Sequence, residues 1–273
     1  MDEYIVPAAG QRWTEVLKMP ESNRVFCCRQ RAGPLVKESR AIRPRLSQYD
    51  SPYERAEKNK ILRPPRDSSV CRSRIDRLEL LLALFGYDGW VYSLTFDDEH
   101  LPCKFRDVRR KRWRSFLRRL QIEHGGAFDY IYLIEGRHGD HRYHLHLVAR
   151  YSDFPPMVME DLWRFGYVEG KPLLCIGRDP YDTFRRTAKY FCKERSDGIT
   201  IPIDARTWVA SRHLRAQLPP PEYFMADSCE IPLPEHYRVY GRNNVDNAFG
   251  HYSYLWYIEH DPYIQNSTQD STK

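Results

Sequence analysis

Two short segments with strand-like alternation, DYIYLIE at 129–135 and RYHLHLVAR at 142–150, constrain the fold of this chain most strongly. Both are rich in aromatic and branched apolar residues, and a polar segment containing two glycines, GRHGDH, joins them. Because strands connected in this way pair as a hairpin, the sequence predicts an antiparallel hairpin over 129–150. Alternation along the second strand predicts that Leu145 and Leu147 face a core, with His144 and His146 together on the opposite face.

Periodic segments on both sides of the hairpin extend this prediction. WVYSLTF alternates like a strand, and GYVEG with PLLCIG can supply another. Four other segments carry apolar residues at helical spacing. The expected helices cover 74–85, 104–122, 157–165 and 181–194. The fold class expected is therefore α+β, with a central antiparallel sheet and flanking helices.

The two ends of the chain differ from this periodic middle. Residues 1–75 are rich in Arg, Lys, Pro and Ser and show little apolar periodicity, which predicts a basic, poorly ordered or peripheral extension. Residues 219–273 are punctuated by proline and rich in aromatic residues, which predicts an extended C-terminal segment with a strand at HYSYLWYI. The folded domain is expected over 76–218.

Composition excludes some classes of protein. No apolar run approaches the ~20 residues needed to cross a bilayer, and the N-terminus lacks the charged-then-apolar order of a signal peptide, so a cytoplasmic protein is expected. The seven cysteines form no CxxC pair and favour free thiols over a disulfide framework or a zinc site. A net charge of +6 is compatible with a polyanionic partner.

The histidine pair forms a candidate metal site. Residues two apart on a strand have Cα atoms about 6.7 Å apart on one face, so His144 and His146 can reach a single ion. Pairing of the hairpin brings Glu135 opposite or diagonal to His144, and a His–His–carboxylate set results. Asp97 and His138 are the next candidates for the third ligand. The alternative is a pair of histidines that make ordinary hydrogen bonds at the surface of a sheet.

The helix expected over 181–194 adds a second group. Its apolar positions fall on one narrow face, and Tyr190, Lys193 and Arg186 lie together on the other side. An ammonium group near a phenol favours the phenolate, so Lys193 could make Tyr190 nucleophilic. The alternative is a half-buried aromatic residue on a surface helix.

The helix expected over 104–122 combines one apolar stripe with many arginines. It is expected beside the histidine site, where it would draw in single-stranded nucleic acid. The alternative is a solvated charged face. The arginines expected to bind DNA are Arg109, Arg110, Arg114, Arg118 and, from the later helix, Arg186.

Three segments together resemble, in the same order, the motifs of the HUH endonucleases that start rolling-circle replication of small phages, plasmids and integrated elements. They are YSLTFDDEHLP at 92–102, EGRHGDHRYHLHLV at 135–148 and YFCK at 190–193. The resemblance spans about 90–215, with a weaker match at SRHLRAQLP, and does not extend to the first 75 residues. Because the tyrosine follows the histidines, a replication initiator or a single-tyrosine transposase is favoured over a conjugative relaxase.

The resemblance implies an HUH/RRM-like fold and a site-specific single-stranded DNA endonuclease and strand transferase. His144, His146 and Glu135 would bind Mg²⁺ or Mn²⁺, and Tyr190, aided by Lys193, would form a 5′-phosphotyrosyl link and release a 3′-hydroxyl. The implied partners are single-stranded DNA at a replication origin, a host helicase and a polymerase, in the cytoplasm of a bacterial host.

Two-tyrosine initiators carry a second tyrosine one helical turn from the first, but here the positions four residues away are Arg186 and Glu194. A single active tyrosine per chain is compatible with a dimer during the reaction, in which a second chain supplies another tyrosine. A different class of function also stays open: a non-catalytic RRM-like nucleic-acid-binding domain.

Overall fold

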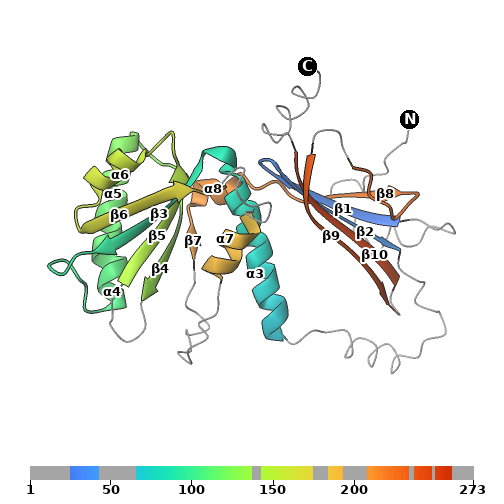
Figure 1. Ribbon diagram of the computed structural model, residues 1–273, viewed down its shortest axis with the longest axis horizontal. Coiled ribbons are helices and arrows are strands. Elements are labelled where there is room, and N and C mark those ends of the chain that lie inside the picture. Colours follow the sequence, from blue (N-terminus) through green and yellow to red (C-terminus); the bar gives the residue numbers. More distant parts are fainter. Residues whose placement is uncertain are drawn as a thin grey trace, which may run out of the picture. The chain divides into compact units, whose positions relative to one another are not determined.

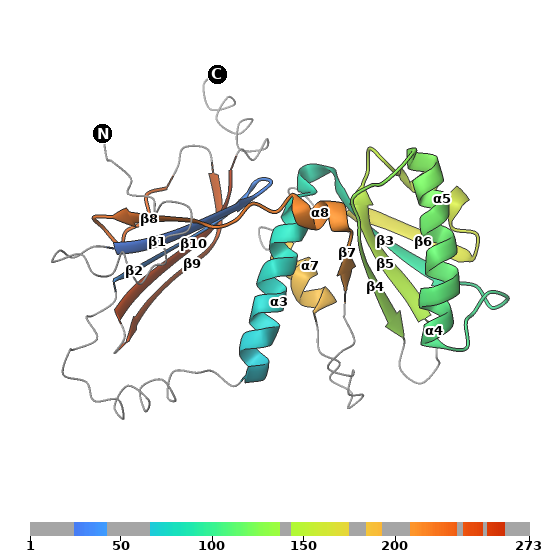
Figure 2. The same ribbon diagram turned by 180° about the vertical axis from the view of Figure 1, so that it is seen from behind.

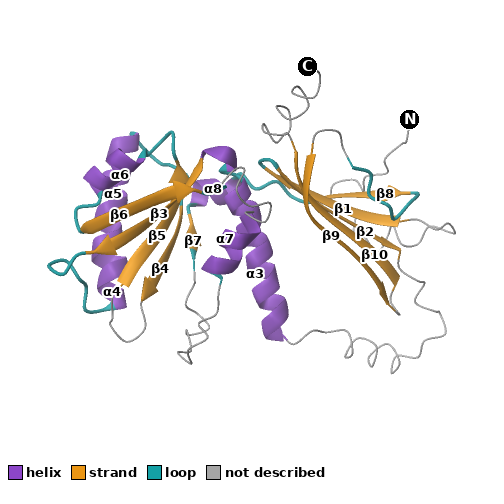
Figure 3. Ribbon diagram, viewed as in Figure 1, coloured by secondary structure: helices purple, strands orange, loops and turns teal. Residues whose placement is uncertain are grey.

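The computed structural model describes residues 25–42, 66–136, 143–174, 184–192, 208–233, 237–247 and 250–259. The chain divides into two compact units, one formed by residues 71–218 and the other by residues 1–70 and 219–273 (Figure 1). Each unit contains a five-stranded antiparallel sheet, and helices accompany the sheet of the first unit (Figure 3). The fold is therefore α+β with antiparallel sheets.

The sheet of the 71–218 unit contains the expected hairpin. Strands β4 (Ile131–Gly136) and β5 (Tyr143–Arg150) pair antiparallel, and Glu135 stands directly opposite His144. This register confirms the pairing predicted from the sequence. The remaining strands extend the sheet on both sides in the order β6-β3-β5-β4-β7. Their bounds are Gly89–Phe96 for β3, Gly166–Pro172 for β6 and Val209–Ala210 for β7.

One face of this sheet is covered by the basic helical segment and a following helix (Figures 1 and 2). The segment runs without interruption through α4 (Phe105–Asp107), the π-helical turn η2 (Val108–Trp113) and α5 (Arg114–His124), and α6 spans Pro156–Leu162. Phe116 and Leu120 pack with Leu145 and Leu147 of β5 in one buried core. The predicted amphipathic helix is confirmed, but the π turn inside it was not expected.

The opposite face carries α3 (Arg66–Ala83) and α7 (Phe184–Phe191), with η1 (Gly86–Asp88) between α3 and β3 in the chain (Figures 1 and 2). Helix α3 begins eight residues before the predicted start, because the segment RDSSVCR continues the helix without an apolar stripe to mark it. Arg185 of α7 pairs with Asp76 at 2.8 Å and with the fully buried Glu79 at 2.9 Å, both on α3. These ion pairs join the two helices.

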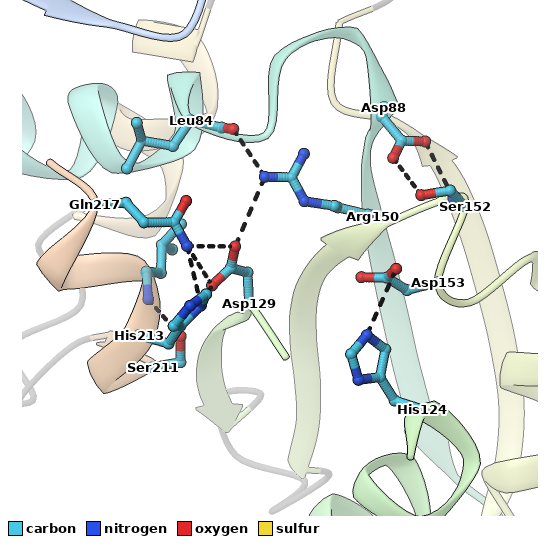
Figure 4. Close-up of polar contacts among 11 residues, drawn as sticks. Leu84, Asp88, His124, Asp129, Arg150, Ser152, Asp153, Ser211, His213 and Gln217 are labelled. Atoms are coloured by element: carbon cyan, nitrogen blue, oxygen red, sulfur yellow. Dashed lines mark hydrogen bonds and ion pairs between the residues drawn. The ribbon is translucent and has the colours of Figure 1, made fainter. Parts of the chain in front are cut away.

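The helix α8 (Arg212–Ala216) is attached to the sheet by a polar cluster around the buried Asp129 (Figure 4). The Asp129 carboxylate lies 2.7 Å from His213 Nδ1, accepts hydrogen bonds from Gln217 Nε2 at 2.9 and 3.1 Å, and lies 3.6 Å from the guanidinium of Arg150. The Ser211 side chain caps the helix by accepting from the backbone N–H of Leu214. One buried carboxylate thus links β5 to α8.

The other unit contains a sheet built from both ends of the chain. Strands β1 (Val25–Ala32) and β2 (Leu35–Ile42) pair with β8 (Glu222–Ala226), β9 (Tyr237–Asn247) and β10 (Gly250–Glu259) in the order β8-β1-β2-β10-β9. Of the two alternatives predicted for the N-terminal extension, poorly ordered or peripheral, poor order is therefore wrong for residues 25–42. The C-terminal segment contributes three strands where the sequence predicted one.

Buried charges explain why the N-terminal strands were missed. Glu38 and Arg40 of β2 occupy inward positions and are almost fully buried. Glu38 accepts hydrogen bonds from Arg29 at 2.7 Å and from Arg40 at 2.9 Å, while Arg40 also donates to the backbone oxygens of Ser228 and Glu230. Because ion-paired residues replace apolar ones on the buried face, the alternation that normally predicts a strand is disguised.

Two further expectations concern membrane spans and cysteines. No helix in the described part of the chain is long and apolar enough to cross a membrane. Among the described residues, the cysteines at 27, 28, 103, 192 and 229 form no disulfide.

Candidate metal centre

The hairpin brings three possible metal ligands together. Glu135 Oε2 lies 3.3 Å from His144 Nε2 and 3.1 Å from His146 Nε2, and the ligand atoms of all three residues lie within 4.8 Å of one another. Two donors bound to one cation at about 2.1 Å and at a right angle would lie about 3 Å apart. The spacing of these side chains therefore suits a divalent cation. Imidazole and carboxylate donors do not identify which metal binds.

Ser93 orients one of the histidines. Ser93 on β3 is paired with His146 in the sheet, and its Oγ lies 3.2 Å from His146 Nδ1. A histidine that binds a metal through one ring nitrogen usually donates its other N–H to a fixed partner, which sets the tautomer. The Ser93 hydroxyl can accept that hydrogen bond, so His146 Nε2 is left for the cation. Sequence reasoning missed this residue, because one serine in a strand carries no distinguishing signal.

The histidines also control the charge of the carboxyl group. Polar contacts with the His144 and His146 imidazoles hold the pKa of Glu135 well below its usual range, against the opposing effect of partial burial. Glu135 is therefore ionised at neutral pH. An ionised carboxylate beside two imidazoles is a set of groups that could hold a divalent cation.

Tyr190 reaches the same group of atoms from α7. Its hydroxyl lies 3.2 Å from Glu135 Oε2 and 3.4 Å from His146 Nε2, and its side chain is 49% exposed. Phe184, Ala188 and Phe191 are buried on the other side of the helix, as the helical phase predicted. The Phe191 ring lies 5.9 Å from the His146 ring, so the packing of α7 fixes the position of the phenol.

The described surroundings of Tyr190 favour the neutral phenol. Burial and the negative charge of Glu135 raise the pKa of Tyr190 above its usual value. A cation bound to Glu135 would oppose the effect of the carboxylate charge on the pKa of Tyr190. From the sequence, Lys193 was predicted to favour the phenolate form of Tyr190. Lys193 and Glu194 lie outside the described residues. Arg186 is exposed on α7.

The structure separates other candidates from this centre. Asp97 accepts hydrogen bonds from the backbone and the ring of His100, and it is not part of the three-ligand group. His138 and Tyr181 lie outside the described residues. Tyr167 of β6 is 72% exposed and pairs with Thr95, which in turn pairs with His144, so a second phenol lies on the same face of the sheet as the candidate metal ligands.

The arginine-rich helix lies on the other face of the sheet. Arg109, Arg110, Arg114 and Arg118 are exposed on η2 and α5, which pack against the same face as Leu145 and Leu147. Side chains alternate along β5, so the histidines point to the opposite face. The expectation that this helix lies beside the histidine site is therefore wrong. Its amphipathic pattern predicts a helix that packs on a sheet, but it does not specify which face.

A comparison of the chain with protein-family models, curated proteins and solved structures finds no significant match. The interpretation of the site therefore rests on its own residues and their geometry. That geometry combines three side chains that could hold a divalent cation with a half-exposed phenol whose oxygen lies within hydrogen-bonding distance of two of them.

Proposed function

We propose that the chain nicks single-stranded DNA by metal-assisted tyrosine transesterification, as the HUH replication initiators that it resembles do. The observation that carries this proposal is the position of the Tyr190 hydroxyl, 3.2 Å from Glu135 and 3.4 Å from His146. A phosphate bound at a cation on these ligands would lie next to the phenol. Proximity of this kind is a large part of the rate advantage of covalent catalysis.

The metal ligands and Tyr190 have different roles in the proposed reaction. A bound Mg²⁺ or Mn²⁺ would polarise a phosphate oxygen and stabilise the charge that develops on it. Tyr190 gives its proton to solvent, and its oxygen attacks phosphorus from the side away from the leaving group. The bond between phosphorus and the 3′ oxygen breaks, the 3′ oxygen takes up a proton, and a 5′-phosphotyrosyl bond forms. No water is consumed, so a 3′-hydroxyl can reverse the reaction.

The fold supports the same proposal. The candidate ligands lie on two adjacent central strands of an antiparallel sheet, and the tyrosine comes from a helix packed on that face. This is the arrangement expected of an HUH/RRM-like domain. In the proposed role the released 3′-hydroxyl at an origin primes synthesis by a host polymerase, with a host helicase separating the strands.

A single nucleophile limits what one molecule can do. Arg186 stands one turn before Tyr190 and cannot form a phosphotyrosine. One protomer is therefore expected to make one cleavage and to reverse or transfer that joint. A continuing cycle then needs Tyr190 of a second protomer, a hydrolytic step, or another phenol such as Tyr167 on the same face.

The proposal is tested by forming the covalent intermediate. The full chain is incubated with Mn²⁺ and random-sequence single-stranded DNA that carries a 3′ fluorophore, and the products are separated under denaturing conditions. A fluorescent protein band is expected, because the downstream fragment stays attached through its 5′ end. The band should require Mn²⁺, disappear in Tyr190→Phe and persist in Tyr151→Phe, a matched control at a tyrosine that is 43% exposed. A band of equal intensity in Tyr190→Phe, or no band with wild-type protein, would contradict the proposal.

A further inference from the structure

A second candidate site lies on the helix-covered face of the sheet. There the basic helical segment and β4 line an open hollow of about 380 Å³. This volume falls within the range of ligand pockets, about 300–1,000 Å³. Three cationic side chains and three apolar or aromatic ones line it. The lining residues are Arg109, Arg110, Trp113, Arg114, Leu117 and Tyr132.

The floor of the hollow is apolar and fixed in position. Trp113 and Tyr132 stack with their ring centroids 4.0 Å apart and an interplanar angle of 26°, and both are more than nine-tenths buried. Trp113 ends the π-helical turn, which begins at Val108 and contains Arg109 and Arg110. Turns of this kind occur frequently at functional sites, because they change which side chains share one face of a helix. Here the turn places arginines beside an aromatic floor.

The charges around the hollow are poorly balanced. Residues 104–123 contain nine Lys and Arg residues and two acidic residues. One of the two acidic residues, Asp107, pairs with Lys111. Lys111 does not line the hollow, so this ion pair does not neutralise the arginines that do. Within the described part of the chain, neither Arg110 nor Arg114 has an acidic partner. The Arg109 guanidinium lies near the Tyr132 hydroxyl, and its charge opposes the rise that burial causes in the pKa of Tyr132. The hollow thus presents guanidinium groups that are available to an anion.

We propose that this hollow binds a phosphodiester group of a nucleic-acid strand, with Arg110 and Arg114 on the phosphate and the Trp113–Tyr132 floor against the adjoining sugar or base. Guanidinium groups match phosphate oxygens in geometry as well as charge. The choice of DNA as the polyanion rests on the proposed function. Because the hollow and the metal ligands lie on opposite faces of the sheet, the strand held here is a different segment from the one that is cleaved.

Binding in the absence of metal tests this inference without relying on cleavage. The affinity of the full chain for fluorescent single-stranded DNA is measured by anisotropy in EDTA over a series of salt concentrations. In Arg110→Gln/Arg114→Gln, binding should weaken at least about tenfold, and the slope of log K against log salt should fall by about 1.4, roughly 0.7 for each phosphate that is no longer neutralised. The matched control, Arg106→Gln/Lys111→Gln, removes two exposed charges from the same helical segment outside the hollow. For this control variant, the slope of log K against log salt should change little.

Other outcomes separate the alternatives. Equal losses in the two double variants would indicate diffuse attraction and overturn the hollow as a site, while leaving adduct formation through Tyr190 intact. Saturable binding of a labelled mononucleotide as tight as that of the strand would replace the phosphodiester with a free nucleotide. Loss of strand binding in His144→Ala under EDTA would place the bound strand on the metal-binding face. If the predicted slopes are found but no adduct forms, this inference stands and the proposed function fails.

Discussion

Removal of the Ser93 hydroxyl is expected to weaken metal binding by about ten- to a hundredfold, although Ser93 itself does not touch the cation. In Ser93→Ala the ring nitrogen Nδ1 of His146 loses the partner that lies 3.2 Å away. His146 is only 7% exposed, so water replaces that partner poorly. A buried donor left without an acceptor costs about 1–3 kcal/mol. The other tautomer avoids that cost but puts the proton on Nε2, the atom that faces Glu135.

The loss of the hydrogen-bond partner and the change of tautomer are both expected to weaken metal binding. A cost of about 1.4 kcal/mol corresponds to a tenfold change in affinity, so the expected loss follows directly from the burial of His146. Titration calorimetry with Mn²⁺ measures it. Ser93→Thr is the matched control, because it keeps a hydroxyl at the same strand position and should bind within a few-fold of wild type. Unchanged affinity in Ser93→Ala, or an equal loss in Ser93→Thr, would refute the reasoning.

Three other changes test separate parts of the structure. His144→Ala, His146→Ala and Glu135→Ala should each lose Mn²⁺ affinity and DNA cleavage together, and a Glu135→Ala protein with both intact would show that another residue supplies the third ligand. Asp129→Ala should lower the free energy of unfolding by about 2 kcal/mol, because it removes the acceptor of a cluster of donors, and urea denaturation compared with Asp129→Asn measures the loss. Arg185→Gln should also destabilise the protein by about 2 kcal/mol and slow cleavage without changing Mn²⁺ affinity, since it loosens α7 and leaves the metal ligands in place. A Mn²⁺ affinity that falls in parallel with cleavage would contradict that positioning role.

The parts of the site that follow local periodicity could be predicted from the sequence. The two-residue repeat of a strand puts His144 and His146 on one face, and the hairpin register puts Glu135 opposite His144. The 3.6-residue repeat of a helix puts Tyr190 on the side of α7 away from its buried residues. Each of these relations depends on neighbours within a few residues or on one short hairpin.

The parts that depend on distant partners could not be predicted. Ser93 becomes distinctive only when β3 pairs with β5 and brings its hydroxyl to His146. The strands at 25–42 acquire their partners from the last quarter of the chain, and the buried ion pairs of Glu38 and Arg40 hide their alternation. An amphipathic pattern likewise shows that the arginine-rich helix packs on a sheet, but the choice of face is a tertiary property.

The identity of the nucleophile is the central claim, and mass spectrometry of the DNA adduct tests it most directly. Wild-type protein is allowed to react with single-stranded DNA and Mn²⁺, the DNA is digested to a short remnant, and the protein is cleaved into peptides. The proposed mechanism predicts a nucleotide remnant joined by a phosphodiester bond to Tyr190. A remnant on Tyr167 or on any other residue, or DNA cleavage without a covalent remnant, would contradict it.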